Sequence, residues 1–141
     1  MNKLIYIKKN GDLNTGYLSF FESNKDIPFE IKRIYYIYEV PVGTKRGMHA
    51  HKNLKQLLWC SYGRIEVMLD NGKEKIFFIL DSPEKGLLVG GGIWHDMIWK
   101  KEGSVLCVAV SEYYNEDDYI RDYNEFMRCV EEGCWKDENK F

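Results

Sequence analysis

Short strand-like runs, separated by turn residues, fill most of this sequence. Ile31–Tyr38 and Gln56–Cys60 are rich in β-branched, aromatic and apolar side chains, and Arg64–Leu69 alternates polar with apolar residues. Asp70-Asn71-Gly72 tolerates the positive φ of a tight turn, and Lys75–Leu80 follows it, so this segment predicts a β-hairpin. Further strands are expected at Gly86–Val89, Trp94–Trp99 and Val105–Val110. The pattern is typical of an all-β sandwich or barrel.

The last part of the chain changes from strand-like to helical periodicity. Apolar residues recur there at spacings of one, three and four: Tyr119, Ile120, Tyr123, Phe126, Met127 and Val130. We expect a helix over about 116–132, capped by Asn115, ended by Gly133 and packed on the sheet through its aromatic face. With 141 residues and 45% hydrophobic content, the chain is predicted to form one domain over 1–141, with a barrel over about 1–112.

The net charge, the lack of long apolar runs and the cysteine spacing limit the binding partners and the cellular location that we expect for this chain. The 20 basic and 22 acidic side chains give a net charge of −2 without a basic, aromatic-interleaved run, so nucleic acid is not an expected partner. No apolar run suits a signal peptide or a membrane span, which predicts a cytoplasmic protein without a membrane partner. The four cysteines contain no C-x-x-C pair, and we expect all of them to be reduced packing residues: Cys60, Cys107, Cys129 and Cys134.

The three histidines of the chain are His49, His51 and His95. Alternate side chains on a strand share one face, so the imidazoles of His49 and His51 would project together from Cα atoms roughly 7 Å apart. One small molecule could then contact both rings. The surrounding spacing is also specific: five residues separate Gly43 from His49, four separate His51 from Gln56, and six separate Gln56 from Gly63.

This spacing resembles the first sequence signature of the cupin superfamily, and Gly90–His95 resembles the second. The resemblance implies a cupin-type antiparallel β-barrel, or jelly roll, with all three histidines in its lumen. Gln56 stands in place of the carboxylate ligand of the usual pattern, and Gly90 and Trp99 replace its Pro and Asn. Because an amide is a poor metal donor, we expect no metal and no cofactor, and histidines that transfer protons near neutral pH.

Other polar residues extend the predicted site. Arg33 and Tyr35 are two apart on a predicted strand and therefore share a face, while Arg46 lies three residues before His49. Tyr35 could hydrogen-bond a developing enolate oxygen or shuttle a proton. The two arginines could bind a diphosphate through bidentate hydrogen bonds.

Several longer segments together resemble the WxcM-like group of sugar 3,4-ketoisomerases, which act on dTDP-4-keto-6-deoxyglucose. The segments are Asp26–Phe29, Ile31–Ile37, Arg46–Lys52, Leu80–Pro83, Gly86–Gly90, Trp94–Met97 and Ser111–Arg121. The resemblance runs from about Leu13 to Phe126. It implies a metal-free barrel that forms a homodimer by exchanging N-terminal strands. It also implies a role in making 3-amino-3,6-dideoxyhexoses for bacterial surface glycans.

The resemblance also assigns roles to residues. It implies His49 and His51 as the catalytic histidine pair, Tyr35 as the active-site tyrosine and Arg46 as the phosphate-side arginine. We expect His49 to remove the C3 proton beside the C4 ketone, giving an enediolate that is reprotonated at C4, with His51 and Tyr35 relaying protons. The two histidines could exchange these roles in a coupled titration. The remaining residues predicted to bind substrate are Arg33, His95, Gln56 and Thr15.

The product configuration and the reaction class have alternatives. Trp94-His95-Asp96-Met97 has the form that accompanies galacto products in this group, whereas Thr15 replaces the group's usual Tyr or Arg and leaves the C4 configuration open. A metal-dependent cupin oxygenase would instead use the three histidines as metal ligands. A sugar-binding cupin without turnover and a sugar 3,5-epimerase are the other possibilities.

Overall fold

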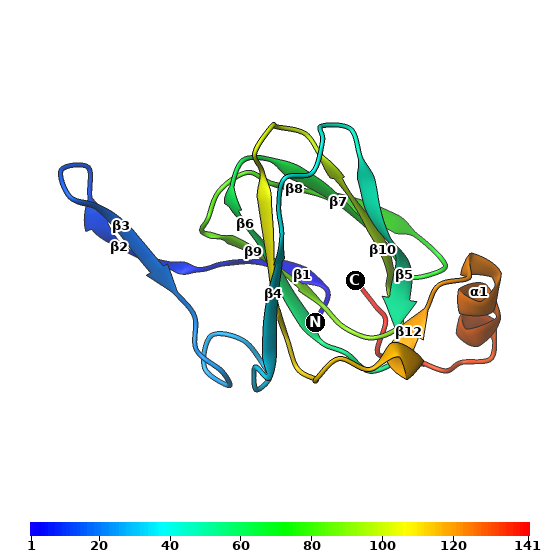
Figure 1. Cartoon of the computed structure of the whole chain (residues 1–141). Coiled ribbons are helices and arrows are strands. Elements are labelled where there is room, and N and C mark those ends of the chain that lie inside the picture. The colour runs from blue at the N-terminus through cyan, green and yellow to red at the C-terminus, as the bar shows by residue number, and fades with distance from the viewer.

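Two five-stranded antiparallel sheets pack face to face and form a barrel, as Figure 1 shows for the computed structural model of residues 1–141. The first sheet has the order β1-β9-β6-β11-β4 and the second has the order β12-β5-β10-β7-β8. In the first sheet the strands are β1 Lys3–Tyr6, β4 Arg33–Ile37, β6 Gln56–Tyr62, β9 Lys85–Val89 and β11 Val105–Val110. In the second they are β5 Lys45–His51, β7 Ile65–Asp70, β8 Lys75–Leu80, β10 Trp94–Trp99 and β12 Tyr119–Ile120. The predicted all-β class is confirmed.

The main core lies between the two sheets, where inward side chains of both sheets meet. Fifteen buried residues form this cluster, with Trp99 among the largest fully buried side chains. The predicted hairpin is also present: β7 pairs with β8, Gly72 has a φ of 86°, and the Asn71 side chain accepts hydrogen bonds from two turn amides. The inward alternation of apolar residues, read from the sequence, thus produces the barrel wall.

A hairpin arm stands away from the barrel and was not expected from the sequence. It consists of β2 (Lys8–Asp12) and β3 (Gly16–Phe20), and every residue of both strands is exposed (Figure 1). The segment lacks the apolar alternation that marks a half-buried strand. The arm lies outside the barrel that was expected to begin at residue 1.

The helix α1 (Tyr123–Glu131) begins later than predicted. Asp122 is its N-cap and accepts hydrogen bonds from two amides of the first turn, whereas Asn115 caps a short 3₁₀ helix, η1 (Glu116–Asp118). The predicted start and cap of the helix were therefore wrong. Gly133, with a φ of 77°, follows the helix end as expected. No helix in the structure has the length and apolar character needed to span a membrane.

The segment just before α1 was also assigned wrongly. Tyr119 and Ile120 form β12, which pairs with β5 at His51 and Ala50. Their apolar spacing suited a helix, but the pairing with β5 satisfies their backbone in extended form. Tyr119 consequently lies against the histidines rather than on a helix face.

Two of the four cysteines are bonded, which corrects the prediction that all are reduced. Cys129 in α1 forms a disulfide with Cys134, while Cys60 and Cys107 are free. The turn at Gly133 brings the two Cα atoms to 5.4 Å, within the range that a disulfide requires. Four residues separate the two cysteines, a spacing that matches no C-x-x-C motif, so the bond was not predicted.

A β-bulge in β5 orients the residues that face the lumen. On β10, His95 pairs with His49 but Asp96 pairs with Gly47, so Met48 is the extra residue. Gly47 and Met48 both have positive φ, of 90° and 59°. Simple alternation would turn Arg46 away from His49, but the bulge shifts the alternation by one residue. Arg46 and His49 therefore line the same pocket.

We expect Gly47→Ala to lower the free energy of unfolding by about 1–3 kcal/mol, measured by urea denaturation. A methyl group there would lie 2.9 Å from the Met97 sulfur and 3.0 Å from the His95 carbonyl oxygen, at a φ that disfavours alanine. Gly43→Ala is the matched control, because Gly43 has a φ of 87° but nothing within 4 Å of an added methyl. An equal loss of unfolding free energy in the two variants would show that close packing against Gly47 contributes nothing to stability beyond the backbone strain.

Candidate active site

All three histidines converge in the barrel lumen. His49 and His51 project from β5 and His95 from β10, and their ring nitrogens lie within 4.8 Å of one another. The His49 ring centre is 4.9 Å from that of His51 and 4.7 Å from that of His95. The structure thus brings together the residues that the signature spacing places in one site.

Burial keeps two of these imidazoles uncharged. Burial, together with the neighbouring His51, lowers the pKa of His49 to about 4. Burial, with His49 and His51, also holds the pKa of His95 well below its usual value, and the His95 Nδ1 lies 3.1 Å from the Ile93 carbonyl oxygen. Because a neutral imidazole has a free lone pair, His49 can accept a proton at neutral pH.

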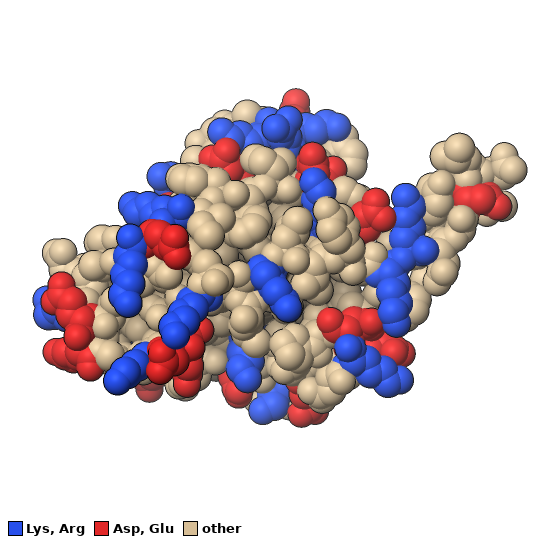
Figure 2. Space-filling model, turned by 180° about the vertical axis from the view of Figure 1, so that it is seen from behind, with Lys and Arg blue, Asp and Glu red and all other residues tan.

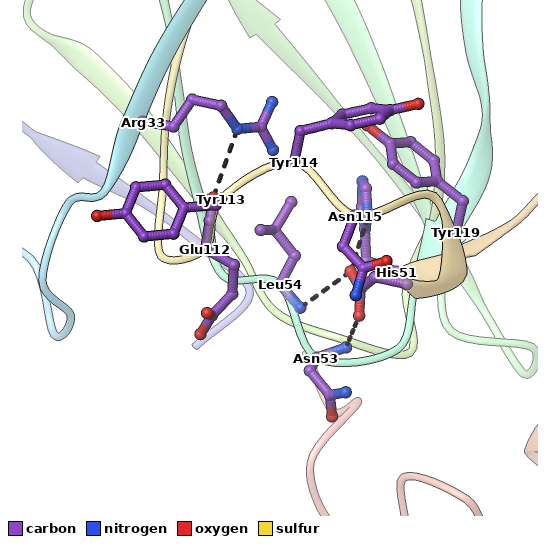
Figure 3. Close-up of a pocket in the computed structure, with 10 residues that line it drawn as sticks. Arg33, His51, Asn53, Leu54, Glu112, Tyr113, Tyr114, Asn115 and Tyr119 are labelled. Atoms are coloured by element: carbon purple, nitrogen blue, oxygen red, sulfur yellow. Dashed lines mark hydrogen bonds and ion pairs between the residues drawn. The ribbon is translucent and has the colours of Figure 1, made fainter.

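A carboxylate fixes the orientation of His51. The Asp118 Oδ2 lies 3.1 Å from His51 Nδ1, and Asp118 also accepts the backbone N–H of Asn53 at 2.8 Å (Figure 3). Burial raises the pKa of Asp118, but the hydrogen bonds from His51 and Asn53 outweigh burial and hold that pKa below its usual value. The carboxylate therefore accepts the Nδ1–H of His51, and the buried Nε2 of the ring has no protein partner.

Tyr35 and Gln56 form a second hydrogen-bonded pair beside the histidines. The Tyr35 hydroxyl donates to Gln56 Oε1 at 3.3 Å, and Gln56 is 1% exposed. Burial and Tyr119 raise the pKa of Tyr35 to about 12, against the opposing effect of Arg33. Arg33 shares the inward face of β4 with Tyr35 and lies 5.4 Å from its ring, as the alternation predicted. Tyr35 remains a hydrogen-bond donor at neutral pH.

Two adjoining pockets open onto these groups. A pocket of 330 Å³ is lined by Tyr35, Arg46, His49 and His95, and one of 630 Å³ is lined by His51 and Asp118 (Figure 3). The residues that line both pockets are Arg33, Tyr114 and Tyr119. The pockets together form one site at the open end of the lumen.

The rim of this site comes from a segment whose role sequence reasoning missed. Glu116 binds Arg121 through contacts of 2.8 and 3.1 Å and accepts the Tyr114 hydroxyl. Arg121 in turn lies 4.3 Å from the ring of Tyr119. The expected helix over about 116–132 included most of this segment, so neither Asp118 nor the rim residues were predicted as site residues. The one feature of the sequence that could have indicated them is that they lie in Ser111–Arg121, a segment that resembles the WxcM-like group.

Comparison with known proteins identifies the family. Residues 1–131 match the family model described as "FdtA: WxcM-like, C-terminal". The chain belongs to this family. It is 45% identical over 129 residues to the TDP-4-oxo-6-deoxy-α-D-glucose-3,4-oxoisomerase of Aneurinibacillus thermoaerophilus, with 92% of each chain covered. The predicted membership of the WxcM-like group is confirmed.

Solved structures of FdtA-type proteins have the same fold. The sugar 3,4-ketoisomerase QdtA from Thermoanaerobacterium thermosaccharolyticum, solved with TDP, is 40% identical, with a TM-score of 0.89 over 92% of this chain and 94% of that one. A 3,4-ketoisomerase from Helicobacter canadensis is 43% identical, with a TM-score of 0.87 over 92% of this chain and 96% of the other. The predicted cupin-type fold with its C-terminal helix is confirmed.

The lumen of this FdtA-family chain departs from the metal set of other cupins. The three imidazoles are close enough to share a cation after small movements. However, the position of the usual carboxylate ligand is occupied by Gln56, whose oxygen already accepts the Tyr35 hydroxyl. The residues present do not supply the anionic ligand of the cupin pattern.

Thr15 is the one predicted site residue that lies away from this pocket. It is at the tip of the hairpin arm, where its hydroxyl donates to Asp12 at 3.1 Å. The arm projects from the far side of the barrel relative to α1 (Figure 1). Within one chain, Thr15 cannot contact a ligand at the histidines.

We expect the free energy of unfolding to fall as the pH is lowered from about 6.5 to about 4, by on the order of 3 kcal/mol through His49. The folded-state pKa of His49 lies below its unfolded value, so the unfolded chain binds more protons in this window. His95 adds a loss of the same sign. Urea denaturation at several pH values should give a shallower slope for His49→Asn. An unchanged slope would mean that His49 is not held neutral by the fold.

Proposed function

We propose that this chain is a sugar 3,4-ketoisomerase that converts a dTDP-linked 4-keto-6-deoxy-D-glucose to its 3-keto isomer. The observation that carries the proposal is a neutral His49 that lies beside an Asp118-bound His51 and shares its pocket with a protonated Tyr35. The named activity of the 45% identical relative supports it. So does QdtA, solved with TDP and, as a single-residue variant, with TDP-4-keto-6-deoxyglucose.

The isomerisation requires a base, an acid and a group that stabilises charge on oxygen. The C3 proton is acidic because it lies next to the C4 ketone, and His49 accepts it to give the enediolate. Tyr35 donates a hydrogen bond to the developing oxyanion. O4 is then protonated, the O3 hydroxyl gives up its proton and C4 receives one, which leaves a hydroxyl at C4 and the carbonyl at C3. His51, oriented by Asp118, relays these protons through its Nε2.

The edge of the pocket suits the diphosphate of the substrate. Arg33 and Arg46 line it from β4 and β5, and both are partly or fully exposed. Guanidinium groups bind phosphate oxygens bidentately, so these residues anchor the nucleotide while the sugar reaches the histidines. His95 and Gln56 complete the wall around the sugar. The site thus separates a charged anchoring region from a buried reacting region.

Incubation with dTDP-4-keto-6-deoxyglucose in deuterated water, followed by NMR, should show the carbonyl moving to C3 with deuterium at C4. Deuterium would be partly lost if His49 returned the abstracted proton. A chelator should have no effect. In ordinary water, a small H4–H5 coupling would identify the galacto product that Trp94-His95 favours, and a large coupling would identify the gluco product.

His49→Asn should lower turnover by about a hundredfold to ten-thousandfold, and Tyr35→Phe should also lower it. Tyr62→Phe is the control, because Tyr62 is 54% exposed at the end of β6 that lies away from Gln56. Unchanged substrate with the native protein would contradict the isomerase, and binding without conversion would indicate a sugar-binding module. Chelator-sensitive oxygen consumption would indicate a metal oxygenase instead.

The second part of the proposal is a homodimer with exchanged N-terminal arms. The arm exposes Leu13 at 91%, Leu18 at 61% and Tyr17 at 50%, more apolar surface than an isolated hairpin sustains. The barrel offers a free edge at β4, where Ile34 and Tyr36 are exposed. A second copy would cover both surfaces, and its arm would carry Thr15 to the neighbouring barrel.

Leu18→Glu should convert the dimer to a monomer in sedimentation velocity, because a buried carboxylate at the arm interface would be unpaired. Phe77→Glu is the control, since Phe77 on β8 is 62% exposed and lies on the other sheet. A native protein that sediments as a monomer, or a Leu18→Glu variant that stays dimeric, would contradict the exchange.

The cellular setting follows from the reaction and stays a prediction. A keto group at C3 is the substrate for an amination that yields 3-amino-3,6-dideoxy sugars, used in bacterial surface glycans. Nucleotide-linked sugars favour a cytoplasmic location. Basic and acidic side chains are interspersed over the face shown in Figure 2, in keeping with the net charge of −2. Neither nucleic acid nor a membrane is part of the proposal.

A further inference from the structure

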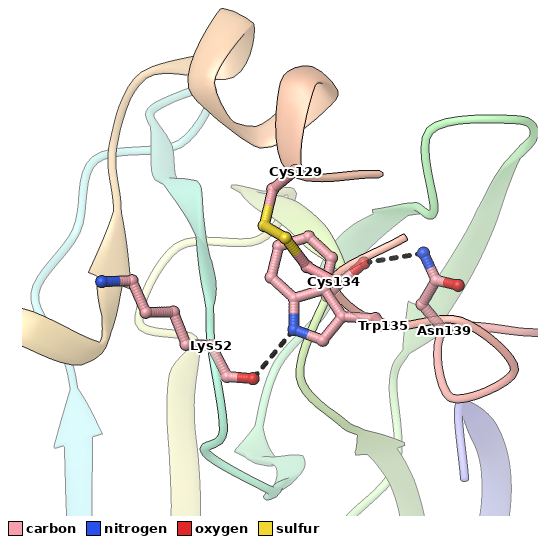
Figure 4. The surroundings of a disulfide bond; sticks show 6 residues. Lys52, Cys129, Cys134, Trp135 and Asn139 are labelled. Carbon is pink, nitrogen blue, oxygen red and sulfur yellow. Dashed lines mark hydrogen bonds between the residues drawn. A yellow bond between two sulfur atoms is a disulfide. The ribbon is translucent and has the colours of Figure 1, made fainter. Parts of the chain in front are cut away.

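The last ten residues, 132–141, lie beyond the family match, yet they pack onto the barrel beside the site. Trp135 is the anchor of this segment. It is 5% exposed, belongs to a buried cluster with Phe126, and its ring centre lies 5.9 Å from that of Phe126. Figure 4 shows its indole next to the Cys129–Cys134 disulfide and directed at Lys52.

Trp135 contacts both backbone segments that hold His51 in place. The indole Nε1–H donates to the carbonyl oxygen of Lys52, the next residue in the chain, at 2.9 Å (Figure 4). Its ring also lies against Gly92, where an added methyl group would approach to 2.5 Å. The Gly92 N–H donates to the His51 carbonyl oxygen at 2.8 Å. Trp135 therefore holds the Lys52–Asn53 peptide and packs on Gly92, whose N–H binds the His51 carbonyl oxygen.

The turn at Lys52–Asn53 also binds Asp118, the carboxylate partner of His51. The Lys52 N–H donates to the Asp118 carbonyl oxygen at 2.9 Å, and the Asn53 N–H donates to Asp118 Oδ1 at 2.8 Å. Movement of the Lys52 peptide would shift Asp118 and His51 relative to each other. A hydrogen bond of 3.1 Å between them leaves little room for such a shift before it weakens.

The segment around Trp135 is itself fastened to the barrel. Cys134 is bonded to Cys129 of α1, and its N–H donates to the Cys129 carbonyl oxygen at 3.0 Å. Beyond the indole, the Asn139 amide donates to the carbonyl oxygens of Asn71 at 3.1 Å and Gly92 at 3.4 Å. The chain is thus attached to the protein both before Trp135, by the disulfide, and after it, by Asn139. A rigidly held indole can restrain the position of the Lys52 carbonyl group as well as fill space.

We propose that Trp135 is a positioning residue for the His51–Asp118 pair, supplied by a segment outside the part of the chain shared with the family. The proposal deepens the proposed function and rests on it for its kinetic consequence. Trp135 does not touch the reacting atoms; it acts by holding the Lys52 peptide through its N–H. Loss of that N–H lets the pair drift from the geometry required for proton relay.

The kinetic test compares Trp135→Phe with the native enzyme and with a matched control. Phenylalanine keeps an aromatic ring in the cluster but removes the donor to Lys52, so kcat should fall about tenfold while KM changes less than about twofold. The control is Trp59→Phe, because Trp59 packs on Phe21 outside the site and contacts none of these residues. Given an active native enzyme, an unchanged kcat in Trp135→Phe overturns the proposal, whatever its melting temperature.

A second measurement needs no turnover and separates this proposal from the proposed function. In the unliganded protein labelled with ¹⁵N-histidine and ¹⁵N-tryptophan, NMR follows exchange of the His51 Nδ1–H with water. Trp135→Phe should speed that exchange about tenfold, while the indole N–H of Trp99, bonded to Ser104, serves as the reference. Unchanged His51 exchange overturns the proposal even if the native protein is active. Faster His51 exchange in Trp135→Phe, together with a native protein that shows no turnover, would support the positioning role of Trp135 and contradict only the proposed isomerase activity.

Discussion

The pairing of β5 with β10 determines the chemistry of this barrel, because it places three imidazoles in a lumen that solvates charge poorly. Burial disfavours the protonated ring, and each histidine would repel a charged neighbour at these distances. His49 and His95 are consequently neutral at physiological pH. The same burial keeps Tyr35 protonated. One constraint thus sets His49 as a proton acceptor and Tyr35 as a donor, in contact with one pocket.

The strands and the histidine cluster were predictable because local pattern and tertiary environment agree there. Lys75–Leu80, Trp94–Trp99 and Val105–Val110 have the predicted bounds, since each is a short run rich in apolar, aromatic or β-branched side chains between turn residues. The histidines were found by spacing, because residues at i and i+2 share a strand face. Tyr35 and Gln56, twenty-one residues apart, meet because their strands both pair with β11.

The parts that were missed depend on contacts between distant segments. Asp118 reaches His51 across sixty-seven residues, and nothing in the local sequence around Asp118 distinguishes the partner of a buried histidine from a charge near a helix terminus. β12 is a two-residue strand, and its two apolar residues suit a helix equally well; only the pairing with β5 makes the segment extended. The Cys129–Cys134 bond requires the turn at Gly133, and the position of Arg46 requires the bulge.

The residues of the site therefore differ in how much their positions depend on distant parts of the chain. The imidazoles belong to the barrel wall, whose strands are held by ladders on both sides, so their placement is robust. Asp118 is the last residue of the short 3₁₀ helix η1, outside the barrel wall, and its position relative to His51 depends on the Lys52–Asn53 turn. A partner on such a short element, which must lie within a few tenths of an ångström, needs support from outside the wall. In this chain the turn receives that support from Trp135, which explains why a buried indole is placed beyond the end of the last helix.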